Sequence, residues 1–237
     1  MKSKRDVIAE VLSRKERHFK KIPRLTQTER RFFDLEGAIY LLNRQSDFPA
    51  RHKRELYRHV PVALIAISEG YFRMLYRDLI DSGEPYLSAA GNFRDVKLDI
   101  TSLVGAQKRS ITLGDLISHQ LGHSSLGDIE SNLSILLNQD FSIEFTKRLK
   151  NEDGGDPKAI FEKQLRRLIV YIFSQRHIYC HELATTVSPR KYELETSIKA
   201  FRVYISLIEM HIAEYTKCPT VKGVAEARNE PSDCTHG

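Results

Sequence analysis

The chain has 237 residues, and its 37 Lys and Arg exceed its 31 Asp and Glu to give a formal net charge of +6. This length allows one ordinary hydrophobic core with an appendage, which we prefer to two small domains. The three cysteines are odd in number and lack C-x-x-C spacing, so they indicate neither a disulfide framework nor a zinc knuckle. The longest apolar run, Val60 to Ile67, has eight residues against the roughly 20 that a membrane span requires. We therefore expect a cytoplasmic protein without a membrane segment.

The positive charge is confined to the N-terminal part of the chain. Residues 1–59 hold 16 Lys and Arg against 8 Asp and Glu, a net charge of +8, whereas the remainder has a net charge of −2. Such asymmetry favours a polyanionic partner, with nucleic acid ahead of a membrane surface. The alternative, an ordinary solvated helical surface, stays open. The candidate nucleic-acid contacts are Arg51, Lys53, Arg54 and Arg58.

Hydrophobic periodicity predicts helices over residues 8–19, 26–44, 47–58 and 62–80. Thr26 and Glu29 are predicted to form a capping box at the start of the second of these helices. Pro61 is expected in the first turn of the fourth helix, where a proline is tolerated. Residues 81–83, Asp-Ser-Gly, are expected to stop this helix.

The rest of the chain is predicted as a loop over residues 84–111, then helices over 112–121, 125–137, 143–149, 157–187 and 189–217. The loop contains apolar alternation typical of a strand, but one strand has no partner. Capping signals open the helices at Thr112 and at Ser125. Asp156 is expected to cap the helix that begins at Pro157.

The two long C-terminal helices are joined by almost no linker, so we expect them to pack antiparallel as a hairpin. The predicted seam sets Leu165, Leu168, Ile169, Ile172 and Phe173 against Ile198, Phe201, Ile205 and Ile208. Helices 62–80 and 112–150 then close a four-helix bundle. The expected fold is all-α, with a basic N-terminal helical extension (1–59), a helical bundle (60–217) and a flexible C-terminal tail (218–237).

The most informative stretch is Arg176-His177-Ile178-Tyr179-Cys180-His181, near the end of a long predicted helix. It joins an always-charged phosphate binder to two groups that titrate near neutrality, which is the combination that metal-free RNA cleavage needs. Arg176 and His181 lie about 140° apart around a helix, so one copy cannot focus both on one atom. His177 and His181, four residues apart, share a face. A second helix must complete the site.

This stretch resembles the signature of the HEPN superfamily (higher eukaryotes and prokaryotes nucleotide-binding domain), Arg-x(4 to 6)-His at the end of the penultimate long helix of a bundle. The resemblance covers roughly residues 60–216, and it implies an up-down four-helix bundle. Residues 68–72, Ser-Glu-Gly-Tyr-Phe, are similar to a Glu-Gly-aromatic pattern of some prokaryotic members. Arg54 and His59 repeat the spacing, but they precede Pro61 in a polar helix where a sheltered pocket is not expected.

The resemblance implies an endoribonuclease without metal or cofactor, which cleaves RNA through the substrate's own 2′-hydroxyl. Arg176 would bind the phosphate, His181 would act as acid or base, and His177 would orient the substrate or share the proton transfer. Glu69 is expected to support the site by pairing with Arg176, or to pair with Arg73 instead. A second subunit would complete the cleft, so we expect a homodimer. The family's use in prokaryotes implies a toxin or antiviral defence effector, with a cognate antitoxin or defence-system partner.

Three alternatives stay open from the sequence. The protein could be a non-catalytic HEPN dimer that serves as an RNA-binding or assembly module. Arg176 and His181 could be cations that complement a helix C-terminus. His177 and His181, with Glu182 adjacent, also have metal-ligand spacing, although no second helix motif completes a di-metal site.

Overall fold

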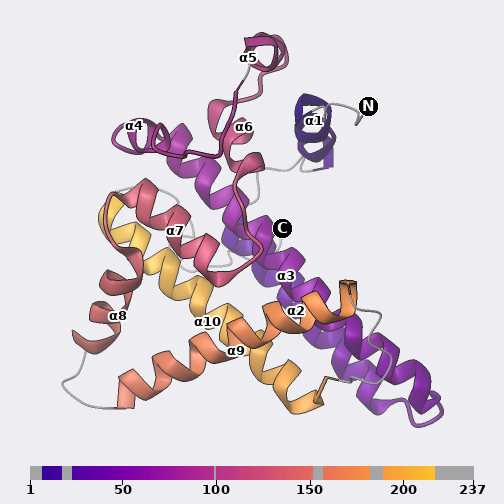
Figure 1. The fold of residues 1–237 in the computed structure, drawn as a ribbon. Coiled ribbons are helices and arrows are strands. Elements are labelled where there is room, and N and C mark those ends of the chain that lie inside the picture. The colour runs from indigo at the N-terminus through magenta and orange to yellow at the C-terminus, as the bar shows by residue number, and fades with distance from the viewer. Residues whose placement is uncertain (1–6, 18–22, 99, 152–156, 182–188, 217–237) are drawn as a thin grey trace, which may run out of the picture.

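The computed structural model describes residues 7–17, 23–98, 100–151, 157–181 and 189–216. Within these ranges the chain forms ten α-helices and no strand, which confirms the all-α prediction (Figure 1). No helix in these ranges is both long and apolar enough to cross a membrane. The helices are α1 (Val7–Arg17), α2 (Arg24–Arg44), α3 (Ala50–Asp81), α4 (Tyr86–Ala90), α5 (Ile100–Gln107), α6 (Leu113–Gln120), α7 (Leu126–Leu137), α8 (Phe141–Asn151), α9 (Pro157–His181) and α10 (Lys191–Thr216).

Helix α3, with 32 residues, is the axis on which most of the other helices pack. It runs diagonally across Figure 1 and contacts α2, α4, α6, α7, α9 and α10. The prediction of two helices separated before Pro61 is wrong, because Pro61 lies inside this one helix. A proline in a helix interior costs about 3 kcal/mol. Val60 and Leu64, on either side of it, are buried in the main core, and burial stabilises by about 1.5–3 kcal/mol for each such side chain.

The predicted helix boundaries at Thr112, Ser125 and residues 81–83 are confirmed. The Thr112 hydroxyl accepts a hydrogen bond from the backbone N–H of Asp115 at 3.0 Å, and the Asp115 carboxylate accepts one from the Thr112 N–H at 3.1 Å. Ser125 caps α7 through the N–H of Asp128 at 3.0 Å. After α3, Gly83 adopts a φ of 93°, which costs a glycine nothing and any other residue about 1–2 kcal/mol.

Two local predictions are wrong because long-range contacts compete with them. Helix α2 begins at Arg24, two residues before the expected capping box, and Glu29 instead accepts a hydrogen bond from Arg202 of α10 at 2.7 Å. The segment 84–111, expected as a loop, contains α4 and α5. Helix α4 buries three of its five residues, and α5 buries Ala106 against α1 and α6, so packing stabilises both short helices.

Helix α6 approaches the end of α3 very closely at Gly114. The Gly114 N–H donates to the Asp81 carboxylate at 3.0 Å. A Cβ atom at this position would lie 2.6 Å from the Arg77 carbonyl oxygen, closer than real Cβ atoms come. Burial raises the pKa of Asp81, and the bonds from Thr112 and Gly114 oppose this rise. Only a glycine therefore lets α6 lie against α3 at this distance.

Helices α9 and α10 pack through the predicted seam but not as the expected antiparallel hairpin. All nine predicted seam residues lie in the main core or against it, and the rings of Phe173 and Phe201 are 6.3 Å apart. In Figure 1, however, the two helices cross at a wide angle. Antiparallel helices would run side by side in every view, so the axes of α9 and α10 are not antiparallel. Beyond the crossing, α10 leaves α9 and packs on α8, where Tyr204 contacts Phe145 at 5.5 Å between ring centroids.

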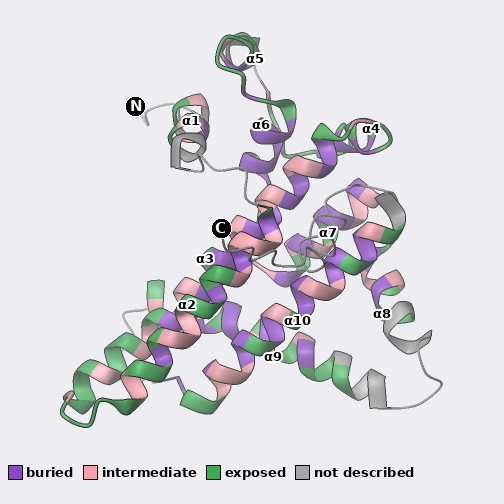
Figure 2. Ribbon diagram, turned by 180° about the vertical axis from the view of Figure 1, so that it is seen from behind, coloured by how far each residue is buried: buried purple, intermediate pink, exposed green. Residues whose placement is uncertain are grey.

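One main core joins the two parts that the sequence separated at residue 59. Phe32 and Ile39 of α2 are buried in the same cluster as the residues of α3, α7, α9 and α10. Figure 2 shows buried positions along the inward faces of these helices and exposed ones where α2 ends and α3 begins. The expected boundary falls inside α3. The predicted cap Asp156, the helix residues 182–187, and the tail 218–237 lie outside the described residues.

A buried ion cluster ties α2 to α3 and α10. The Arg24 guanidinium donates to both carboxylate oxygens of Glu209, at 2.6 and 2.8 Å, and to Asp78 at 2.8 Å. Arg24 and Glu209 are only 7% and 6% exposed. Burial alone would lower the pKa of Arg24, but its bonds to Glu209 and Asp78 raise it above the ordinary value. Burial and the charge of Glu209 raise the pKa of the neighbouring Tyr71.

Removal of Arg24 should destabilise the fold strongly. Arg24→Ala leaves the Glu209 carboxylate buried without its partner, which costs about 3–5 kcal/mol. Urea unfolding followed by circular dichroism measures this loss. Arg30→Ala, which removes an exposed arginine from the same helix, should change the free energy of unfolding by less than about 0.5 kcal/mol. Equal effects of the two substitutions would contradict the structural role of the cluster.

Candidate functional site

The predicted catalytic residues lie on the last turns of α9. His177 and His181 are exposed, and their ring centroids are 5.1 Å apart with an interplanar angle of 48°. Arg176 is half-buried, and its side chain forms no ion pair or hydrogen bond with any residue that the structure describes. The two imidazoles therefore share one face of the helix, as expected for residues four apart.

The preceding turns of α9 hold these side chains in place. Ile169, Ile172 and Phe173 are buried in the main core. Gln175 is 9% exposed, and its side-chain oxygen accepts a hydrogen bond from the Tyr179 hydroxyl at 2.7 Å. The buried side of the helix thus fixes its rotation, and the histidines are left on the outward side.

The first half of α3 lies beside the end of α9, which the sequence did not predict. Arg58 lies near enough to Tyr179 to act on it electrostatically: burial raises the pKa of the Tyr179 hydroxyl, and the positive charge of Arg58 opposes this rise. The Arg58 side chain is 15% exposed and pairs with Glu55 at 2.8 Å. The sequence did not predict this neighbourhood because the basic helix was expected to end before Pro61. A short separate helix would not be held beside α9, whereas the continuous α3 is.

The start of α10 forms the other side of this region. The Tyr171 hydroxyl donates to the Glu193 carboxylate at 2.7 Å. Burial and this carboxylate raise the pKa of Tyr171. Tyr171 and Tyr179, which precede and follow Arg176 on α9, are therefore close to Glu193 of α10 and Arg58 of α3.

The four predicted nucleic-acid contacts lie on the same half of α3 but differ in accessibility. Arg51 and Arg54 are exposed, Lys53 is half-buried, and Arg58 is engaged as described above. Arg51 and Arg54 are therefore the residues of this set that are most accessible to a phosphate backbone.

Glu69 lies in a different region from Arg176. It lines a cavity of about 460 Å³ together with Arg73, one turn further along α3, and with residues of α6 and the loop after it. Among the described side chains, Glu69 and Arg176 form no hydrogen bond or ion pair with each other. His119, on the same cavity, bonds through Nε2 to the Glu10 carboxylate of α1 at 2.8 Å, and the His123 ring stacks on Tyr76. The sequence did not single out this second group of histidines.

In the described part of the chain, no three His, Cys, Asp or Glu side chains come together as a group that could hold a metal ion. Glu182, the third member of the metal site considered from the sequence, lies outside that part. The structure thus describes two of the three side chains on which that alternative depends, His177 and His181.

Comparison of the chain with models of protein families, with curated proteins and with solved structures finds no match in any of the three.

The contact between α3 and α9 gives a testable titration. Arg58→Met removes a positive charge that favours the phenolate, so the pKa of Tyr179 should rise further. The ultraviolet absorbance of the phenolate, followed against pH with Tyr179→Phe as the reference, isolates this residue. Arg54→Met, which removes an exposed arginine from the same helix, should leave the titration unchanged. A titration of Tyr179 that Arg58→Met does not move would show that the two side chains are apart in solution.

Proposed function

We propose that the protein is a metal-independent endoribonuclease of the HEPN type. One observation carries this proposal: the exposed imidazoles of His177 and His181 lie 5.1 Å apart next to Arg176, which no described carboxylate neutralises. Proton transfer requires imidazoles that a substrate can reach, and phosphate binding requires a positive charge that no carboxylate neutralises. A role as a toxin or antiviral defence effector in the cytoplasm is part of the same proposal.

Four long helices share one core, which supports a HEPN-like bundle, although α9 and α10 cross at a wide angle instead of running up and down beside each other. Helices α3, α7, α9 and α10 all bury side chains in one core, and the Arg-x(4)-His stretch ends the penultimate long helix. Two features are additional to such a bundle. Helix α2 shares the core, and α3 extends beyond Pro61 towards the N-terminus.

The proposed reaction uses the substrate's 2′-hydroxyl as the nucleophile. His181 takes its proton while the oxygen attacks the adjacent phosphorus, and the fork of N–H donors on Arg176 stabilises the extra negative charge of the phosphorane. The bond from phosphorus to the 5′-oxygen then breaks, and a second imidazole protonates the leaving oxygen. The products are a 2′,3′-cyclic phosphate and a 5′-hydroxyl.

A second subunit is part of this proposal because of helix geometry. Arg176 and His181 lie about 140° apart around α9, so one helix cannot direct both at a single phosphate. A two-fold axis next to the end of α9 would bring a second copy of each residue to the opposite side of the substrate. Such an axis would place two imidazoles from different subunits on the attacking and leaving oxygens.

The alternative is a HEPN dimer that binds RNA without cutting it. Exposed Arg51 and Arg54, on the half of α3 that lies beside α9, favour RNA binding equally under both proposals. RNA binding that depends on these two arginines, without any cleavage by the purified protein, would identify the alternative.

Loss of Arg176 or His181 should abolish most of the cleavage. Arg176→Ala and His181→Ala should each lower the rate about 10²- to 10³-fold, as expected for loss of a charge-stabilising or proton-transferring group. The double variant should lose much less than the product of the two effects, because the residues act as a unit. Gel analysis of mixed RNA incubated in EDTA measures the rates, and end-group analysis identifies the cyclic phosphate.

Arg167→Ala and His52→Ala are the matched controls, since each removes an exposed residue of the same type elsewhere. Both variants should retain wild-type cleavage. Products with 5′-phosphates, or activity that returns only with added divalent metal, would reject the proposed chemistry.

The protein should sediment as a dimer at micromolar concentration. Because the proposed site needs side chains from two subunits, mixing Arg176→Ala with His181→Ala subunits should restore part of the activity. Sedimentation velocity and cleavage assays of the mixture test this together. A monomer that retains full cleavage activity would contradict the shared site.

A further inference from the structure

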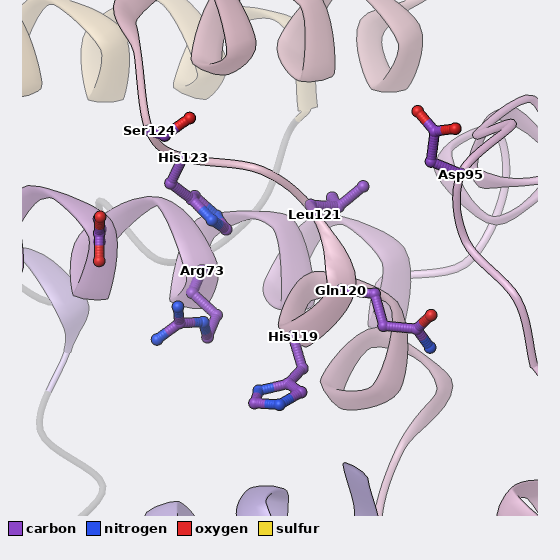
Figure 3. Close-up of a pocket in the computed structure, with 8 residues that line it drawn as sticks. Arg73, Asp95, His119, Gln120, Leu121, His123 and Ser124 are labelled. Atoms are coloured by element: carbon purple, nitrogen blue, oxygen red, sulfur yellow. The ribbon is translucent and has the colours of Figure 1, made fainter. Parts of the chain in front are cut away.

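Three neighbouring cavities, which share lining residues and are together called the groove here, lie outside the proposed catalytic site. The first, of about 460 Å³, is the cavity that contains Glu69 and Arg73 (Figure 3). It shares Asp95, Gln120 and Leu121 with the second, of about 330 Å³. The second shares Asn92, Ser131 and Ile135 with the third, of about 480 Å³. The groove therefore runs from α3, past the loop between α6 and α7, to the end of α7.

The close-up shows which residues lie at each end of the first cavity. In Figure 3, Arg73 and His123 lie on one side, and Gln120 and Asp95 lie on the side that continues into the second cavity. The loop residue Leu121 lies between them. A ligand that follows the groove would thus pass over this loop from one cavity to the next.

Side-chain amides recur along the whole groove. Asn92, Gln120, Asn132, Asn138 and Gln139 line it, and Gln120, Asn132 and Gln139 form side-chain hydrogen bonds with other described residues. An amide side chain both donates and accepts, which matches the N–H and C=O groups of an extended polypeptide. The Ser131 hydroxyl adds a further donor at the third cavity, whereas the Ser134 hydroxyl already donates to the Glu130 carbonyl at 2.7 Å. Such a lining suits a peptide backbone better than an apolar ligand.

The charge of the groove is opposite to that of the chain as a whole. Four carboxylates line it, those of Glu69, Asp95, Asp128 and Asp140, against the two guanidinium groups of Arg73 and Arg94. The whole chain carries a net charge of +6. This local excess of negative charge repels phosphate groups and attracts ammonium and guanidinium groups.

We propose that this groove binds an extended segment of a partner protein that carries Lys or Arg side chains. The amides hold the backbone of the segment, and Asp95 and Asp140, both exposed, pair with its basic side chains. Arg176, His177 and His181 do not line the groove, so this interaction is separate from RNA cleavage.

Fluorescence anisotropy with short labelled peptides tests the proposal on the full chain. An Arg–Ser repeat peptide should bind, whereas Glu–Ser and Gln–Ser repeats of the same length should bind at least about tenfold more weakly. Asp95→Asn with Asp140→Asn should raise the Kd of the basic peptide about three- to tenfold, because each exposed ion pair contributes up to about 1 kcal/mol. Asp140 accepts the N–H of Ile143 at 3.0 Å, and asparagine caps a helix equally well, so α8 should persist.

The matched control is Asp34→Asn with Asp47→Asn, which makes the same change in charge at two exposed positions outside the groove. It should leave the Kd of the basic peptide unchanged. Equal binding of the three peptides, no binding of any, or no effect of the groove variant would overturn the proposal. Binding of a labelled single-stranded DNA tests the opposite ligand. If Arg94→Gln weakens DNA binding and leaves binding of the basic peptide unchanged, the groove binds nucleic acid and the proposal is wrong.

Discussion

The bond between Arg24 and Glu209 is the constraint on which the arrangement of this protein depends. It joins residues 185 positions apart in the sequence, and with Asp78 it connects three helices at one point. A guanidinium group forms paired hydrogen bonds with a carboxylate in only a few geometries. The pair of Arg24 and Glu209 therefore fixes both the orientation of α2 against α10 and the distance between the two helices. A purely apolar contact at this position would tolerate sliding. The ion cluster therefore sets the position of α2, on which the first half of α3 packs in turn.

Local signals in the sequence predicted what depends on neighbouring residues. The caps at Thr112 and Ser125 and the stop at Gly83 are properties of four or five consecutive residues, and all three are present. The seam residues of α9 and α10 were predictable because burial follows helix periodicity. The continuity of α3, the two short helices of residues 84–111 and the crossing of α9 and α10 were not predictable. Each of them depends on contacts between segments far apart in the chain.

The candidate site shows the same division. The side-by-side histidines follow from their spacing, and the structure places them on an exposed face of α9. The position of Glu69 depends on how α3 is rotated against α6, which no short motif encodes. The group formed by Arg73, His119 and His123 was missed for the same reason, since its members come from α3 and from α6 with the loop after it, which are far apart in the sequence.

Helix α3 also makes a single rigid connection between two distant parts of the surface. Its 32 residues span about 48 Å at the usual rise of 1.5 Å per residue. One half carries Arg58 beside the end of α9, and the other half carries Glu69 and Arg73 in the groove. A ligand that shifts or rotates this helix from the groove side must change the surroundings of Tyr179 as well. Thermodynamic linkage then requires reciprocity: whatever factor such a ligand applies to RNA affinity, RNA applies to the affinity of that ligand.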